Sequence, residues 1–224
     1  MYNRLLTSED VNDCYKVIER EKWQERGFNH FDLWSKDAAI LKWVTVLEEF
    51  KAIGKNNLNV IDLGTSTGVV PHIIASWGNN VTGIDLNGID HWCPKGLVKM
   101  VLGDALYELR QMEEESVDVI TDLCAVHEFN TNSNDEFENI GWKEVSEQAY
   151  RVLKTGGMLL ISTDVTLSPS VRNPGGFISP KSLIKIIQKS GLKLTSSYKK
   201  KYEKNPYYQS DVDLYIATLS FKKP

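Results

Sequence analysis

The sequence predicts an α/β fold, a doubly wound sheet of seven strands whose last strand is antiparallel, preceded by a helical extension. From Leu58 onward, short apolar strands alternate with helices, as in βαβ units with a parallel sheet. The last two strand candidates, at about 192–199 and 214–221, have no helix between them, which indicates an antiparallel hairpin. The 224 residues, 42% of them hydrophobic, are enough for one large domain with a substantial core.

Two helices are predicted before the sheet. The first runs from Ser8 to about Arg26, and the second from Ser35 to Gly54, each with serine as N-cap. Glycine is typical of the position just after a helix. Aromatic residues gather between the two helices: Phe28, Phe31 and Trp34. We therefore expect a helical cap over residues 1–57 and a sheet domain over residues 58–224.

Within the sheet domain, each predicted strand is a short apolar run. The strand candidates are residues 59–63, 81–85, 97–102, 117–122 and 158–162. Helices are predicted over residues 69–77 and 142–153, the second ended by Gly156-Gly157. The last helix begins at Ser179-Pro180 and runs to Gly191, because serine is a good N-cap and proline fits the first helical turn.

Composition excludes several functional classes. Lys and Arg total 26 against 30 Asp and Glu, so the net charge of −4 argues against a general electrostatic grip on nucleic acid. Cys14, Cys93 and Cys124 form no CxxC pair, so neither a disulfide framework nor a zinc site is expected. No apolar run reaches the roughly 18 residues that span a membrane, and the first ten residues lack a signal-peptide core. We expect a cytoplasmic protein without a membrane or nucleic-acid partner.

The most informative segment is Val60–Val70, VIDLGTSTGVV, in which a strand leads into an acidic residue, a loop bounded by glycines, and a helix. Gly64 lets the chain turn at the strand end, and Gly68 lets the helix start close to a ligand. A dinucleotide fingerprint would need glycines where the chain has Ser66 and Val69, and no Gly-Lys-Ser/Thr is present for a phosphate loop. A tight turn that binds nothing is the alternative.

Acidic residues follow three successive strands. Asp62, directly before the loop, suits a ligand with an ammonium group rather than a pyrophosphate. Asp85 ends the next strand, where an acid accepts hydrogen bonds from both hydroxyls of a ribose, and Asp104 can meet the exocyclic amine of adenine. Each acid alone is more often a helix cap or a solvated loop residue. Together at three neighbouring strand ends, they describe a ligand with an amino-acid end, a ribose and an adenine.

These residues resemble the motifs of the class I S-adenosylmethionine-dependent methyltransferase family. Its D-x-G-x-G-x-G motif and its acids after the second and third strands are matched at Asp62, Gly64, Gly68, Asp85 and Asp104. Ser66 stands in place of the middle glycine. Residues 151–161, RVLKTGGMLLI, resemble the family's R-V-L-K-P-G-G segment, with Thr155 in place of proline. The resemblance covers about residues 58–220 and implies a Rossmann-like sheet.

The resemblance also implies a transferase that moves the methyl group of S-adenosyl-L-methionine to an oxygen or nitrogen of a small molecule. The residues expected to bind this cofactor are Asp62, Gly64, Thr65, Ser66, Gly68, Asp85, Leu86, Asp104, Ala105 and Asp122. His127 is the expected general base, and Glu128 would orient it or accept the proton. A histidine that packs under the cofactor is an equal alternative. Trp34 and His30 are expected to face the substrate.

Other interpretations stay open on the sequence. Asp122 and Asp164 end adjacent strands and would suit Mg²⁺, but Val165 stands where the metal-dependent branch has Asn, so we expect no metal. The lysines and tyrosines of residues 198–204 would suit RNA, but a solvated hairpin tip is the commoner explanation and fits the net negative charge. A protein substrate, aminopropyl transfer, and cofactor binding without catalysis are further alternatives. The acceptor and the oligomeric state are not fixed by the sequence.

Overall fold

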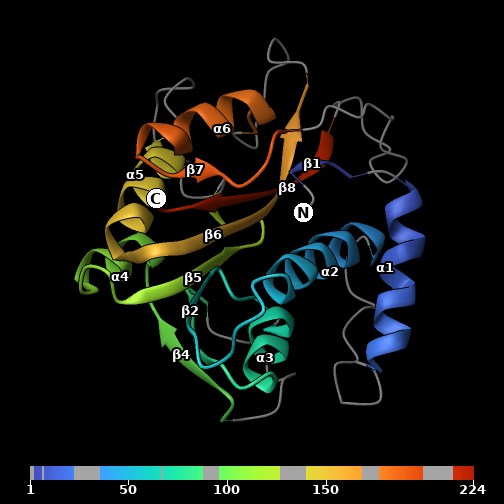
Figure 1. Ribbon diagram of the computed structural model, residues 1–224, viewed down its shortest axis with the longest axis horizontal. Coiled ribbons are helices and arrows are strands. Elements are labelled where there is room, and N and C mark those ends of the chain that lie inside the picture. The colour runs from blue at the N-terminus through green and yellow to red at the C-terminus, as the bar shows by residue number, and fades with distance from the viewer. Residues whose placement is uncertain are drawn as a thin grey trace.

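The structure is a computed structural model that describes residues 3–6, 8–22, 36–66, 68–87, 96–126, 140–167, 177–198 and 214–224. These residues form a central sheet with helices on both faces (Figure 1). The strands are β1 (Arg4–Leu5), β2 (Asn59–Leu63), β3 (Asn80–Asp85), β4 (Val98–Leu102), β5 (Val117–Asp122), β6 (Leu153–Thr166), β7 (Lys193–Leu194) and β8 (Leu214–Lys222). The helices are α1 (Ser8–Glu21), α2 (Lys36–Lys51), α3 (Val69–Ser76), α4 (Ala105–Gln111), α5 (Ile140–Val152) and α6 (Pro180–Lys189).

Five parallel strands form the centre of the sheet, in the order β4-β3-β2-β5-β6. β8 runs antiparallel beside β6, and both β7 and β1 pair antiparallel with β8. The strand order changes direction between β2 and β5, the topological switch point where doubly wound sheets bind ligands. The predicted fold class and the antiparallel last strand are confirmed. The two-residue strand β1 is an addition that the sequence did not indicate.

Two apolar layers attach the helices to the sheet. α1, α2 and α3 pack on one face, and α4, α5 and α6 pack on the other (Figure 1). α2 lies between α1 and the strands β6 and β8, so apolar side chains are needed nearly all around it. Accordingly Ile40, Leu41, Val44 and Leu47 are at most 1% exposed. The residues of α2 and of the central strands therefore share one core.

Some elements differ in extent from the prediction. β6 begins at Leu153, earlier than predicted, and its register with β5 shifts before Met158. Gly157 lies in this irregular part, where an added Cβ would come within 3.0 Å of the Asp118 carbonyl oxygen. The predicted strand at 192–199 is reduced to β7. The sequence analysis also missed the short helix α4, which follows β4 directly.

A chain of buried hydroxyl groups joins α2 to the sheet. Thr218 Oγ1 on β8 lies 2.8 Å from Thr45 Oγ1 on α2 and 2.9 Å from Ser162 Oγ on β6. The Thr45 hydroxyl donates to the carbonyl oxygen of Leu41 at 2.6 Å. All three hydroxyl residues are at most 1% exposed, so water does not replace a lost partner.

Replacing the central member of this chain tests its contribution to stability. We expect Thr218→Val to lower the free energy of unfolding by about 1–3 kcal/mol, because two buried hydroxyls lose a partner. Urea denaturation measures the difference. Thr155→Val, at an exposed position, is the control and should change the value by less than about 0.5 kcal/mol. Equal effects of the two substitutions would show that the buried chain contributes nothing.

Candidate functional site

Each of the five parallel strands carries an aspartate within two residues of its carboxyl end. These residues are Asp62 on β2, Asp85 on β3, Asp104 after β4, Asp122 on β5 and Asp164 on β6. Because parallel strands bring their carboxyl ends to one edge of a sheet, all five share the edge at the switch point. Asp62 and Asp122 are buried, Asp104 is exposed, and the other two are partly exposed.

The loop between β2 and α3 approaches the loop after β5 very closely. Gly64 has a φ of 64°, and a Cβ added there would lie only 2.2 Å from the Cβ of Ala125. Ser66 and Gly68 also have left-handed backbones, with φ of 46° and 73°. The loop requires a left-handed backbone at position 66, which explains why the family motif has glycine there. The serine adopts the conformation that the loop requires.

Asp85 holds this loop to the end of β3. Its Oδ2 accepts a hydrogen bond from the backbone N–H of Ser66 at 2.7 Å, and its Oδ1 accepts one from Asn87 at 2.8 Å. Each carboxylate oxygen has a second lone pair for another donor. Leu86, directly after Asp85, is 62% exposed, so a large apolar side chain lies in water at this edge.

Asp62 is buried beneath the same loop, at 2% exposure. The Thr121 hydroxyl on β5 donates a hydrogen bond to its Oδ1. Burial raises the pKa of the Asp62 carboxyl to about 7, against the opposing effect of hydrogen bonds from Thr121 and Thr65, and the charge of Asp85 adds a smaller rise. A carboxyl in this state favours a cationic partner, which would stabilise its ionised form.

Asp104 is an N-cap, the alternative that the sequence left open for an acid of this kind. Its Oδ1 accepts a hydrogen bond from the backbone N–H of Tyr107 at 2.7 Å, in the first turn of α4. Ala105 begins α4 and is buried in the core.

Asp122 ends β5 with one of its two oxygens satisfied. Its Oδ1 accepts hydrogen bonds from the backbone N–H groups of Ala125 and Val126, at 3.0 and 3.3 Å. Its Oδ2 is buried and has no hydrogen-bond partner among the described residues. Burial raises the pKa of this carboxyl to about 7, the two N–H groups and the charge of Lys42 lower it, and the charge of Asp62 raises it.

Lys42, Cys124 and Asp164 form a polar cluster beside Asp122. The Lys42 ammonium on α2 donates to Asp164 Oδ2 at 2.8 Å and to Cys124 Sγ at 3.1 Å. The Cys124 thiol donates to the same Asp164 oxygen at 3.1 Å. Burial raises the pKa of this thiol to about 11, although Lys42 lowers it, so the group stays protonated at neutral pH.

The sequence did not predict a role for Lys42, which lies in the helical extension and not after a strand. The available signal was a single lysine in the apolar run Ala38–Leu47 of a helix with little polar surface. A cation in such a position needs a partner, and Asp164 supplies it.

Four predicted site residues lie outside the described residues: His30, Trp34, His127 and Glu128. In the described part of the chain, no three His, Cys, Asp or Glu side chains gather as ligands for a metal ion. Within the same ranges, no helix combines the length and apolar character needed to cross a membrane.

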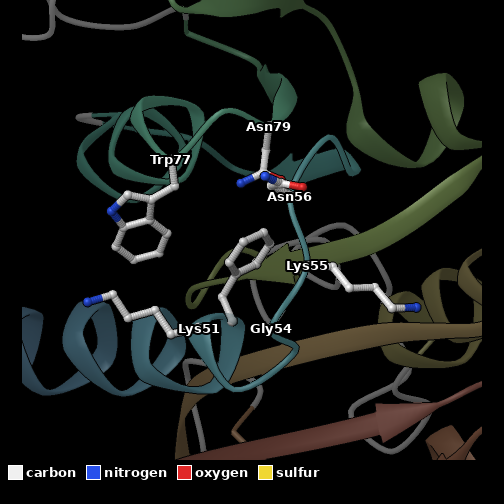
Figure 2. A pocket seen from close by; sticks show the side chains of 7 residues that line it. Lys51, Gly54, Lys55, Asn56, Trp77 and Asn79 are labelled. Carbon is white, nitrogen blue, oxygen red and sulfur yellow. The ribbon is translucent and has the colours of Figure 1, made fainter.

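A separate hollow of about 350 Å³ lies at the opposite edge of the sheet, before β2 and β3. It is lined by Phe50, Lys51, Gly54, Lys55, Asn56, Trp77 and Asn79. Lys51 lies 5.1 Å from the centre of the Trp77 ring, whereas Lys55 points away from Trp77 (Figure 2). Lys51 also pairs with Glu21 at 2.7 Å. The hollow contains none of the motif residues.

Residues 61–161 match a family model described as a methyltransferase domain. This central region is a methyltransferase domain, which confirms the resemblance to class I S-adenosylmethionine-dependent methyltransferases predicted from the motifs. No curated protein matches the chain.

Solved structures with the same fold are distant in sequence. The [4+2]-cyclase SpnF is 14% identical with a TM-score of 0.61, covering 83% of this chain and 82% of its own. The 1,6-didemethyltoxoflavin-N1-methyltransferase of Burkholderia thailandensis, solved with its substrate and S-adenosylhomocysteine, is 16% identical with a TM-score of 0.60, covering 93% and 88%. Phosphoethanolamine N-methyltransferase 2 of Haemonchus contortus, solved with S-adenosyl-L-methionine, is 18% identical with a TM-score of 0.58, covering 81% and 53%. At these identities the likeness shows a shared fold.

Two glycines with similar backbones test the close approach in the cofactor loop. Gly54 has a φ of 66° and open space around it, whereas Gly64 has a φ of 64° and the Ala125 contact. Gly54→Ala should cost about 1–2 kcal/mol for the left-handed conformation alone. Gly64→Ala should cost about 1–3 kcal/mol more, because the added methyl displaces the neighbouring loop. Chemical denaturation compares the two variants, and equal losses would refute the close approach.

The raised pKa values predict how stability depends on pH. Asp62 has an ordinary pKa of 3.8 when unfolded and about 7 when folded, so the folded state binds the proton more tightly. The protein without ligand should therefore lose stability as pH rises from about 4 to about 7. Asp62→Asn should remove roughly 2–4 kcal/mol of this loss, measured by urea denaturation at a series of pH values. A variant whose pH dependence matches that of the unmodified protein would contradict the assignment.

Proposed function

We propose that this protein transfers the methyl group of S-adenosyl-L-methionine to an oxygen or nitrogen atom of a small molecule. The observation that carries the proposal is the glycine-bounded loop held against a row of aspartates at the switch point of a methyltransferase domain. Buried acids suit the cationic end of this cofactor, and a partly exposed acid beside an exposed leucine suits its ribose and adenine.

The residues present fit this cofactor. Asp62 would favour its ammonium group, because a cation offsets the cost of ionising a buried carboxyl. Asp85 would accept the ribose hydroxyls with its remaining lone pairs, and Leu86 would cover one face of the adenine. The loop and the α4 start would complete the site through Gly64, Thr65, Ser66, Gly68, Asp104 and Ala105. When bound, the cofactor supplies an activated methyl group.

The chain would position the acceptor and receive its proton. His127 and Glu128 follow the strand end at Asp122 and are proposed for proton transfer, and Trp34 and His30 are proposed to contact the substrate. Two structural neighbours are named as N-methyltransferases of small molecules, which supports a small acceptor here. The net charge of −4 favours the same choice over RNA.

One structural neighbour favours a second candidate function. SpnF is described as a [4+2]-cyclase and not as a methyltransferase. The same fold therefore also serves a different reaction. The protein would then bind the cofactor without using its methyl group. Formation of S-adenosylhomocysteine in the presence of an acceptor separates the two functions.

Calorimetric titration tests the cofactor site directly. The protein should bind S-adenosyl-L-methionine and S-adenosylhomocysteine, and not NAD. Asp85→Ala should weaken both interactions by about 1–3 kcal/mol, since it removes a hydrogen-bonding carboxylate and loosens the Ser66 loop. Asp118→Ala is the control, because Asp118 pairs with Lys154 at the other end of β5. Unchanged affinity in Asp85→Ala would overturn the cofactor site.

A further inference from the structure

We call the ends of β5 and β6 the acceptor side of the edge, because the residues proposed for proton transfer follow β5. It contains one buried polar atom without a described partner, on Asp122. Asp122 is 1% exposed, and its Oδ2 accepts no hydrogen bond from the described residues. Its Oδ1 is used by the N–H groups of Ala125 and Val126, which fixes the carboxyl plane. Leaving a buried carboxyl oxygen unpaired is costly, so an incoming donor would be strongly favoured at this atom.

The cation near Asp122, the Lys42 ammonium, pairs with a different carboxylate. The Lys42 ammonium lies against Asp164 at 2.8 Å, where the Cys124 thiol also donates. Lys42 therefore neutralises Asp164, and acts on Asp122 only through its field, which lowers the pKa of that carboxyl. Asp62 acts in the opposite direction from β2. The groups facing Asp122 thus leave it without a cation of its own in the described part of the chain.

The charge of the edge discriminates between classes of acceptor. Five aspartates share it, and Lys42 is the cation that the described residues bring to its acceptor side. A carboxylate or phosphate acceptor would meet like charges in a poorly solvated place. An alcohol would supply one donor. An amine supplies several donors and, when protonated, a positive charge.

We propose that the methyl acceptor is an amine whose nitrogen is held and deprotonated by Asp122 Oδ2. This inference rests on the proposed methyl transfer and names the substrate class of that site. In this refinement Asp122 takes the proton-accepting role proposed above for His127. Its carboxylate takes a proton from the ammonium form of the acceptor, which frees the nitrogen lone pair. The nitrogen forms a bond to the methyl carbon, and the carbon–sulfur bond of the donor breaks with its electron pair left on sulfur. The proton passes from Asp122 to water when the product leaves.

Binding to the S-adenosylhomocysteine complex tests the substrate class without turnover. The probes are benzylamine, benzyl alcohol and benzoate, three molecules of similar size with different charge. Calorimetry should show benzylamine binding at least tenfold more tightly than the other two. Tighter binding of benzoate would overturn the proposal and indicate that Lys42 anchors the acceptor. Equal binding of all three probes, or no binding, would also overturn it.

Asp122→Asn separates this inference from the proposed function. Asparagine keeps an oxygen for the two backbone N–H groups and removes the charge, so the fold should be retained. Because Asp122 is also expected near the cofactor, S-adenosylhomocysteine affinity is measured first and the probes are compared on the saturated complex. The preference for benzylamine should fall below threefold. Asp118→Asn, on the same strand but paired with Lys154, should keep that preference. Loss of S-adenosylhomocysteine binding by the unmodified protein would instead refute the cofactor site.

Lys42 is a positioning residue in this arrangement, and the pH profile tests its role. Benzylamine binding should rise as Asp122 ionises near pH 7. Because the charge of Lys42 lowers the Asp122 pKa, Lys42→Met should move this rise to higher pH. If Lys42→Met lowers stability but leaves the pH profile of benzylamine binding unchanged, Lys42 has only a structural role. If Asp122→Asn keeps the same pH dependence of benzylamine binding, another group, such as His127, accepts the proton and the proposal is wrong.

Discussion

Aspartate side chains at the strand ends bind backbone N–H groups of the loops at this edge of the sheet, and the site depends on this interaction. Asp85 binds the N–H groups of Ser66 and Asn87, and Asp122 binds those of Ala125 and Val126. The loops are therefore held open against the sheet edge by the same acids that we propose to face the ligands. The arrangement has a cost, because burial raises the pKa of two of these carboxyls. Ligands with positive charge or N–H groups offset that cost.

The N-terminal helices contribute more than a cover over the sheet. α2 lies in the same core as the central strands, and the hydroxyl chain through Thr45 fixes its position. One turn earlier on α2, Lys42 reaches the end of β6 and pairs with Asp164. A shift of α2 would therefore change both the packing of the core and the charge around Asp122. Stability and acceptor-side chemistry are coupled through one helix.

The sequence predicted the sheet and the cofactor loop because both are local patterns. Alternating periods indicate strands and helices, and Asp62, Gly64 and Gly68 stand at fixed spacings along the chain. The Lys42–Asp164 pair could not be predicted, because it joins residues 122 positions apart in sequence through tertiary packing. Nor could the sequence show that Asp122 keeps one oxygen unused, since that depends on where the next loop turns. The roles of His127 and Trp34 stay predictions.

The hollow of Figure 2 lies at the edge of the sheet opposite to the aspartates. In the hollow of Figure 2, Asn79 Oδ1 accepts from the Leu58 N–H and its Nδ2 donates to the Ile74 carbonyl, while Lys51 pairs with Glu21 and lies against Trp77. The polar groups of Asn79 and Lys51 are thus satisfied within the fold, and their role is explained by the packing of α2 against α3. At the carboxyl edge, by contrast, Asp122 is buried with one oxygen that no hydrogen bond from the described residues satisfies. A buried polar atom without a hydrogen-bond partner is therefore a better indication of a ligand site than the volume of a cavity.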